Sequence, residues 1–221
     1  MNIKEAIEKR FSVRAFTEEV PKIETIKQIL KTAGTAPSGG NIQPWKVYVL
    51  SEKAKKELSD KTLYNFDNGV QEKIEYDIYP KPLADEYKKR RYECGADMYD
   101  ALSIEKDDLD SRFKQIRENY NFFGAPLGMI ITIDRSFGKN GWGHVGMFLE
   151  NLWLSAIDQG LAMCLQESWS IYPKTVKEFI KHPDNEIVWC GVAIGFEDSS
   201  QPINQYRTRR EELSSFVKFI D

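Results

Sequence analysis

The sequence predicts a single domain, spanning residues 1–221, that combines helices with buried strands. Three observations favour this architecture. Apolar residues recur at helical spacing in several segments, two short runs are apolar on both faces as buried strands are, and no flexible linker or repeat divides the chain. With 41% apolar and 29% charged residues, a chain of this length can bury one sizeable core.

The first part of the chain carries clear helix boundaries. Pro21 suits the first turn of a helix, Gly34 suits the end of one, and the Ser51 side chain can cap the next. We expect, in order, helices over 2–10 and 21–33, a loop over 36–45, a strand over 46–50 and a charged helix from 51 to about 60.

The sequence marks the boundaries of the remaining helices and strands less clearly. We expect an insertion or lid over 61–100, with one helix near 84–93, and then a helix after Asp107 or Asp108. A strand over 127–133, a helix over 145–159 and a short helix from Pro173 should follow. The chain should end with a strand over 187–196 and a C-terminal arm over 197–221. The helix over 145–159 is apolar nearly all round, so we expect a central element packed across a subunit interface. The arm ends in apolar residues that need a surface to cover, such as a partner subunit.

Composition excludes several classes of function. The net charge of −3, with acids and bases interleaved, gives no electrostatic case for nucleic acid. The start of the chain is charged and amphipathic, unlike a signal peptide, and the longest apolar run is too short for a bilayer. Cys94, Cys164 and Cys190 form no CxxC arrangement, so we expect no disulfides and a cytoplasmic location. His144 and His182 lack partners at metal-ligand spacing, so no metal is expected.

Two segments carry the groups that a phosphorylated, planar ligand needs. Arg10, Ser12 and Arg14 alternate, so an extended backbone would point two guanidinium groups and a hydroxyl the same way, which suits a phosphate. The loop Ala36–Trp45 contains two glycines and two prolines. Its glycines let main-chain N–H groups come close to a ligand.

Arg207 and Arg209 repeat the alternating pattern near the C-terminus. Either arginine pair, taken alone, also fits a solvated, charged surface. Together with the glycine-rich loop, the two pairs match what the phosphate and the ring of a flavin would require.

The chain resembles the FMN-dependent nitroreductase family through most of its length, and least over 61–100. The segments that carry the resemblance are 10–16 (RFSVRAF), 36–45 (APSGGNIQPW), 121–126 (NFFGAP), 160–167 (GLAMCLQE) and 204–209 (NQYRTR). The resemblance implies an α+β fold, a nitroreductase-like sandwich with a mainly antiparallel central sheet flanked by helices. It also implies an intertwined homodimer with FMN at the interface and the C-terminal arm on the partner.

The resemblance further implies the residues that bind FMN. The ribityl phosphate would be held by Arg10, Ser12, Arg14 and Arg209, with Arg207 beside them. The flavin would be lined, from the other subunit, by Pro37, Ser38, Gly39 and Asn41. Asn121 would contact the pyrimidine edge, and Glu167 and Ser168 match the backbone near the flavin N5. The last two also fit a strand end that caps the next turn.

The activity implied is that of an NAD(P)H-dependent oxidoreductase with a ping-pong scheme. Hydride from NAD(P)H reduces the flavin, the pyridine product leaves, and an electron-poor acceptor such as a nitroaromatic or a quinone then takes the electrons. The hard chemistry belongs to the cofactor. This fits a chain that has two histidines and no catalytic triad.

Three alternatives remain at this point. A cofactor-free interaction protein would purify colourless and gain no stability from added FMN. A flavin-binding carrier or sensor would bind FMN without turnover. A dinucleotide-binding domain is suggested by Gly141-Trp-Gly-His-Val-Gly146, which formally matches GxGxxG, although residues 134–140 separate it from the preceding strand.

Overall fold

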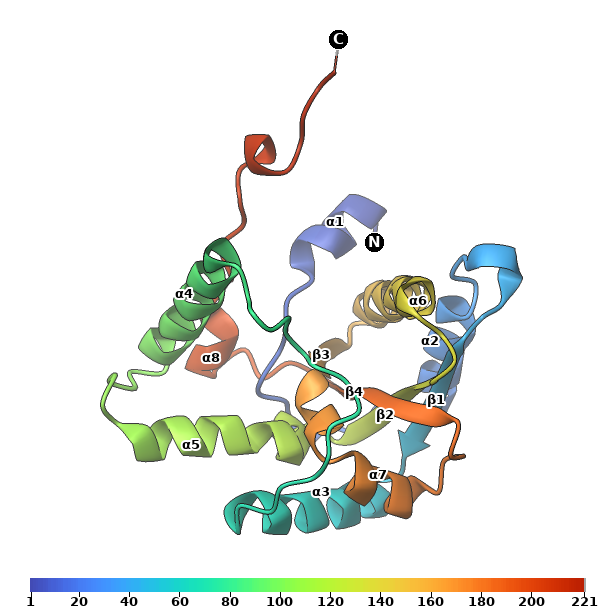
Figure 1. The fold of residues 1–221 in the computed structure, drawn as a ribbon, viewed down its shortest axis with the longest axis horizontal. Coiled ribbons are helices and arrows are strands. Elements are labelled where there is room, and N and C mark those ends of the chain that lie inside the picture. Colours follow the sequence, from blue (N-terminus) through green and yellow to red (C-terminus); the bar gives the residue numbers. More distant parts are fainter. Residues whose placement is uncertain (221) are drawn as a thin grey trace.

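The computed structural model describes residues 1–220, and its centre is a four-stranded antiparallel sheet (Figure 1). The strands are β1 (Trp45–Leu50), β2 (Leu127–Asp134), β3 (Ala162–Gln166) and β4 (Glu186–Gly195). They lie in the order β1-β2-β4-β3, and every neighbouring pair is antiparallel. The expected α+β class and antiparallel sheet are confirmed.

Helices pack on both faces of this sheet. The helices are α1 (Ile3–Lys9), α2 (Ile23–Ala33), α3 (Glu52–Asp67), α4 (Asp85–Ala101), α5 (Leu109–Arg117), α6 (Lys139–Asp158), α7 (Pro173–Ile180) and α8 (Pro202–Gln205). Short 3-10 turns occur at η1 (Gly39–Asn41), η2 (Glu118–Gly124), η3 (Glu167–Ile171) and η4 (Leu213–Ser215).

Strand β2 explains the layered arrangement. Its residues are buried from Leu127 to Ile133, as expected for a strand that is apolar on both faces. Met129 and Ile131 belong to the core beneath α2 and α6, whereas Ile130 belongs to the core beneath α3 and α7. Because successive side chains of a strand point to opposite faces, this one strand contributes to both cores.

Helix α6 is the central helix of the first core. Phe148 and Leu152 pack in the same cluster as Ile26 and Ile29 of α2, and Trp45 stacks on Phe148 with ring centroids 5.0 Å apart. The helix begins at Lys139, earlier than the sequence predicted, because its first turn is polar and glycine-rich and carries no apolar stripe.

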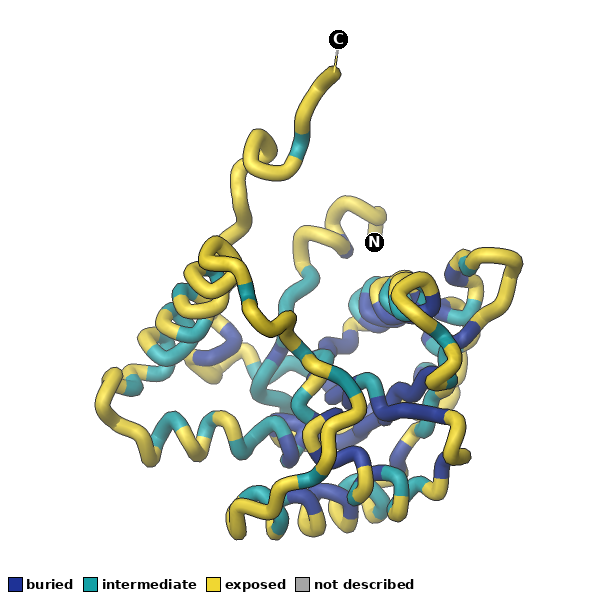
Figure 2. Tube along the Cα trace, viewed as in Figure 1, coloured by how far each residue is buried: buried dark blue, intermediate teal, exposed yellow. Residues whose placement is uncertain are grey.

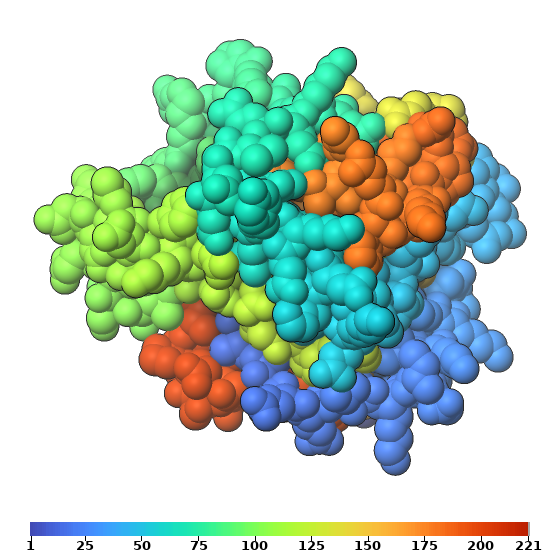
Figure 3. All heavy atoms as spheres, turned by 90° about the horizontal axis from the view of Figure 1, so that it is seen from below, coloured from blue at the N-terminus to red at the C-terminus, as the bar shows by residue number. Residues whose placement is uncertain are grey.

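The second core lies under α3 and α7, which run side by side on the surface (Figure 3). Ser51 caps α3 as predicted, accepting a hydrogen bond from the Ala54 N–H at 3.2 Å. The helix continues to Asp67, beyond the predicted end near residue 60. Its second half stays helical although polar, because Leu58 and Thr62 are fully buried against the core.

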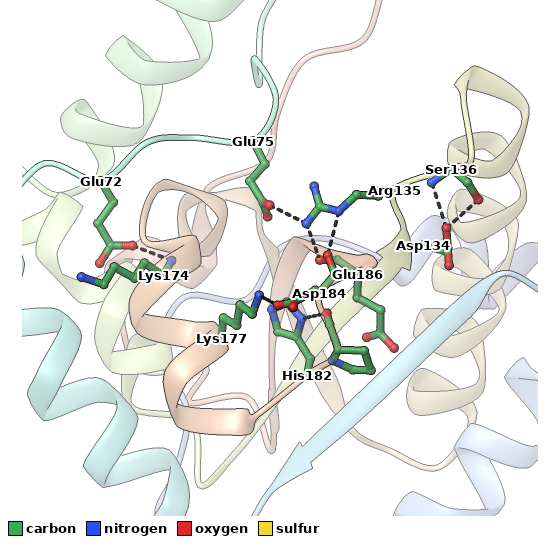
Figure 4. Close-up of polar contacts among 11 residues, drawn as sticks. Glu72, Glu75, Asp134, Arg135, Ser136, Lys174, Lys177, His182, Asp184 and Glu186 are labelled. Carbon is green, nitrogen blue, oxygen red and sulfur yellow. Dashed lines mark hydrogen bonds and ion pairs between the residues drawn. The ribbon is translucent and has the colours of Figure 1, made fainter.

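The segment between α3 and α4 is fastened to the body at three points, two of which are drawn in Figure 4. The Glu72 carboxylate accepts a hydrogen bond from the Lys174 N–H at 2.7 Å, at the start of α7. Glu75 pairs with Arg135 at 2.9 Å, and the Tyr76 hydroxyl donates to the Trp189 carbonyl at 2.5 Å. Residues 70–77 thus form an ordered strap across one end of β4.

Helix α4 is longer than predicted, and the C-terminal arm stands away from the body, whereas the N-terminus pairs with Asp158 of α6 at 3.4 Å (Figures 1 and 2). Ile3 of α1 is 77% exposed, and Phe219 near the C-terminus is 83% exposed. Within residues 1–220, none of the helices is long and apolar enough to cross a membrane.

The dinucleotide-binding alternative is wrong. Gly141, Gly143 and Gly146 all lie inside α6 rather than in a turn after a strand. A Cβ atom at Gly141 would lie 2.5 Å from the Cβ of Phe137, so this glycine serves a close packing contact. The described strands pair only antiparallel, whereas the dinucleotide fingerprint belongs to a parallel βαβ unit.

Candidate functional site

The arginine-rich segment after α1 runs in extended form along the edge of the sheet. The Val13 N–H donates to the Met163 carbonyl of β3 at 3.1 Å, and Phe16 forms a β-bridge with Glu197. Val13 is buried against the core, while Ser12 and Arg14 on the alternate positions stay half-buried. The alternation predicted from the sequence is therefore present.

A buried asparagine joins this segment to the C-terminal region. The Asn204 side chain accepts a hydrogen bond from the Arg14 N–H at 2.9 Å and donates one to the Ala15 carbonyl at 2.8 Å. The Arg207 guanidinium donates to the Asn204 carbonyl at 2.6 Å and lies 3.4 Å over the Phe11 ring. The backbone of Arg14 and the side chain of Arg207 are thereby tied to the same asparagine.

The arginines of this region differ in whether a carboxylate lies near them. Among residues 1–220, neither Arg14 nor Arg207 forms an ion pair with a carboxylate. Arg10 lies 4.0 Å from Glu150 and 4.7 Å over the Trp153 ring. Arg209 pairs instead with Asp97 of α4. The structure thus links the segment that carries Ser12 and Arg14 to Arg207 through Asn204 and Phe11, whereas Arg209 pairs with a residue of α4.

Cys164 lies beneath the arginine segment in a fully buried position. Burial raises the pKa of its thiol to about 11, and Arg14 and Ser12 only partly offset that effect. The thiol is therefore neutral and serves as a packing group, as the sequence predicted.

The glycine-rich loop lies against the beginning of α6. Gly40 and Asn41 have left-handed φ angles of 59° and 57°, and the Ser38 hydroxyl accepts a hydrogen bond from the Gln43 N–H at 3.0 Å. The Gly39 N–H donates to Nε2 of His144 at 3.1 Å. Pro37 and the tip of the loop are exposed, so backbone groups face outward.

The loop and the arginine cluster contact α6 at different places. His144 anchors the loop, whereas Glu150 and Trp153 flank Arg10. At ~1.5 Å of rise per residue, these contacts are roughly 9–14 Å apart along the helix. Within one chain, the structure does not bring Pro37, Ser38, Gly39 and Asn41 to the arginines.

The turn η2 holds an unusual backbone beside Asn121. Phe122 and Phe123 have consecutive left-handed φ angles of 51° and 52°, and both rings are buried. Such a conformation is strained for a bulky residue and persists only where its surroundings enforce it. Here Phe122 stacks on Trp169 at 4.5 Å, and the Asn121 side chain donates to Glu118 at 3.0 Å.

The end of β3 presents polar atoms without partners. Gln166 donates to the Asn119 carbonyl at 2.6 Å, yet its Oε1 atom and the Ser168 hydroxyl are buried without a hydrogen bond in the described part of the chain. Because buried polar groups are nearly always paired, these atoms are suited to a ligand.

Glu167 is an exposed residue at the start of η3, and its carboxyl lies beside Trp189. Desolvation by its neighbours raises the pKa of its carboxyl, and a hydrogen bond with Trp189 lowers it in part. The Tyr76 ring meets Trp142 edge-on at 4.6 Å, and Trp142 lies 5.7 Å from Trp189. The strap that carries Tyr76 therefore lies next to Glu167.

A match to a family model shows which protein family this chain belongs to. A family model described as "Nitroreductase family" matches residues 7–196. The chain belongs to the nitroreductase family. This confirms the resemblance drawn from the arginine segment and the glycine-rich loop.

Curated members of the nitroreductase family match over nearly the whole chain. A 4-nitrobenzoate reductase of Nocardioides sp. (strain LMS-CY) is 34% identical, covering 96% of this chain and 87% of the relative. A nitrobenzene nitroreductase of Ectopseudomonas oleovorans is 32% identical, covering 99% of this chain and 96% of the relative.

Solved structures of nitroreductases superpose closely. The FMN and NADPH-dependent nitroreductase NfnB from sphigopyxis sp. strain HMH matches with a TM-score of 0.96 at 33% identity, covering 100% of both chains. The FMN-dependent nitroreductase NfnB from Mycobacterium smegmatis, in complex with NADPH, matches with a TM-score of 0.93 at 26% identity, again over 100% of both chains.

Several residues that lie around the candidate site were not predicted from the sequence. Asn204 lay in a recognised segment, but nothing in the sequence marked its side chain as a bridge to Arg14. Tyr76 belongs to the region without periodicity. The strained pair Phe122 and Phe123 looks like an ordinary apolar dipeptide, and only the glycine that follows it hints at a turn.

Proposed function

We propose that this chain is an FMN-dependent oxidoreductase that takes hydride from NAD(P)H and passes electrons to an electron-poor acceptor such as a nitroaromatic. The observation that carries the proposal is that Arg14 and Arg207, both tied to Asn204, have no carboxylate partner in the described chain. Guanidinium groups that no carboxylate neutralises favour the binding of an anion. A ribityl phosphate is such an anion.

The residues present fit FMN. Ser12, Arg14 and Arg207 would bind the phosphate, with Arg10 contributing charge from its place over Trp153. Arg209 would join them by leaving Asp97, a surface pair of little energetic weight. The unpaired Oε1 of Gln166 and hydroxyl of Ser168 would face the ring, together with Glu167 and Asn121.

The flavin, when bound, supplies hydride acceptance and donation, and the chain supplies binding, orientation and electrostatics. Donors near the pyrimidine edge would stabilise the negative charge of the reduced ring. Asn121 would orient one edge of the ring, and the backbone at Glu167 and Ser168 would lie near the other. The strap and α4, within the predicted lid, would exclude water.

The functional unit in this proposal is a homodimer. Pro37, Ser38, Gly39 and Asn41 line the flavin of the partner subunit, which accounts for the distance between the loop and the arginines within one chain. The exposed apolar residues of α1 and of the C-terminal arm would be covered by the second copy.

The relatives support a nitroaromatic acceptor. Two of them are reductases of 4-nitrobenzoate and of nitrobenzene. The solved neighbour described as NADPH-dependent supports NADPH as the donor to test first.

A single anaerobic titration tests the proposal. Protein loaded with FMN should lose its flavin absorption bands on addition of NADPH or NADH, and 4-nitrobenzoate should restore them. Bands that persist with both donors would indicate a flavin carrier or sensor. Protein that stays colourless after incubation with FMN would contradict the phosphate assignment.

A further inference from the structure

Helix α4 has two faces with different partners. Toward the C-terminal arm, Arg90 pairs with Glu211 at 2.9 Å, and Asp97 pairs with Arg209. Residues in a helix are separated by ~100° of rotation, so Arg91, Gly95 and Tyr99 lie on the opposite side. There they line a groove of about 360 Å³ between α4 and α5.

This α4–α5 groove is lined by Leu83, Lys88, Arg91, Tyr92, Gly95, Ala96, Tyr99, Lys106 and Arg112. Its charged residues are all cationic. Among residues 1–220, only Lys88 has a carboxylate partner, Asp85 at 2.9 Å. The lining of this groove therefore carries only cationic charges, in a chain with more acidic than basic residues.

Two guanidinium groups of the groove lie over tyrosine rings. The Cζ atom of Arg91 lies 4.3 Å from the Tyr79 ring centroid, and that of Arg112 lies 4.3 Å from the Tyr99 centroid. Arg112 is fixed further by a hydrogen bond from Nε to the Glu105 carbonyl at 3.1 Å. Cation–π stacking occupies the face of a guanidinium and leaves the N–H groups at its edge for an anion.

The floor of the groove has room for a flat ring. A Cβ atom added at Gly95 would meet nothing within 4 Å. The surrounding Leu83, Ala96 and Tyr92 are apolar or aromatic. The volume is near the lower end of small-ligand sites, roughly 300–1,000 Å³, so it suits a single ring rather than a polymer.

We propose that the α4–α5 groove is a binding site for a small aromatic carboxylate, separate from the arginine cluster that lies on the other side of α4. The ring stacks among the tyrosines, and the carboxylate accepts hydrogen bonds from the edges of Arg91 and Arg112. A carboxylate is favoured over a phosphate because the amide groups at the start of α5 already bind Asp108, which accepts from Ser111 at 3.0 Å. This site goes beyond the proposed redox function and does not depend on it.

Isothermal titration of FMN-loaded protein with benzoate tests the site, with benzyl alcohol and acetate as probes that lack the charge or the ring. We expect benzoate to bind and the two probes to bind at least about tenfold more weakly. Arg91→Ala and Arg112→Ala should each weaken benzoate at least about tenfold. Arg90→Ala is the matched control, because this neighbouring arginine faces the arm, and it should leave the affinity unchanged.

Several results would overturn the proposal. Benzoate that does not bind, or that binds Arg91→Ala and the parent protein equally, removes the site. Binding that shifts the flavin absorption bands and survives both substitutions places benzoate at the flavin instead. Adenosine 2′,5′-bisphosphate binding in an Arg91-dependent manner where benzoate fails would make the groove a phosphate site.

Discussion

The side-chain oxygen of Asn204 accepts a hydrogen bond from the backbone N–H of Arg14 at 2.9 Å, across 190 residues of sequence. Asn204 is only 1% exposed, and its amide also donates to the carbonyls of Ala15 and Asp198. One buried side chain thus fixes the backbone on which Arg14 stands. Arg207, which donates to the Asn204 carbonyl, is fixed with it.

Replacing Asn204 should therefore disturb both stability and the arginine cluster. We expect Asn204→Ala to lower the free energy of unfolding by about 1–3 kcal/mol, because it leaves buried backbone groups unpaired. Urea denaturation measures the loss, and the exposed neighbour Gln205→Ala is the control. Equal stability of the two variants would show that solvent replaces the Asn204 bonds.

Two glycines of α6 should respond in opposite ways to alanine. Gly143 is exposed in the helix with nothing within 4 Å of an added Cβ, so Gly143→Ala should stabilise the protein by about 0.5–1 kcal/mol. Gly141→Ala should destabilise it, since the new Cβ would lie 2.5 Å from that of Phe137. Thermal unfolding compares them. Similar effects of both substitutions would contradict the packing role of Gly141.

The spacing of apolar residues predicted the helices and strands that pack in the cores. It did not predict the full length of a helix that buries no side chain. Strand β2 is buried along nearly its whole length, and helix α6 buries an apolar stripe in a core, so their apolar patterns follow their structure. Helix α4 contains no buried residue, so no stripe marks its full length. The two faces of α4 are distinguished only by the residues near them, Glu211 on one side and Arg112 on the other.

Part of the candidate site could be predicted because it depends on a local sequence pattern. The alternation of Arg10, Ser12 and Arg14 is a local pattern that an extended backbone preserves. The bridge from Asn204 and the contact of Tyr76 with Trp189 are long-range hydrogen bonds, and no local pattern encodes their partners. The pairing of Arg209 with Asp97 was likewise invisible in the sequence.

Glu167 should make stability depend on pH. Because desolvation raises the pKa of its carboxyl in the folded state above the usual 4.5, folding is favoured while the group is protonated, and this contribution is lost as the pH rises. Glu167→Gln removes the carboxyl and therefore this loss of stability at higher pH. Its stability relative to the parent protein should increase from about pH 4.5 upward and level off above the raised pKa. Denaturation at a series of pH values tests this, and a difference that grows on acidification would contradict the assigned cause.

The C-terminal arm should contribute to the proposed dimer through its apolar residues. Phe219 is 83% exposed in the single chain, and burying such a side chain is worth roughly 1.5–3 kcal/mol. Phe219→Asp should therefore raise the dimer dissociation constant at least about tenfold in sedimentation equilibrium, while Lys218→Ala in the same arm should not. A parent protein that sediments as a folded, FMN-loaded monomer would rule out the shared site.

The phosphate-binding role of Arg14 and Arg207 is tested most directly by comparing FMN with riboflavin, which has the same ring and no phosphate. Fluorescence quenching on titration into flavin-free protein gives both dissociation constants. Charge-assisted hydrogen bonds contribute roughly 1.5–3 kcal/mol each, so FMN should bind at least about a hundredfold more tightly. Arg14→Ala should weaken FMN at least about tenfold and leave riboflavin unchanged, with the exposed Arg210→Ala as the control. Equal affinity for the two flavins would contradict the account.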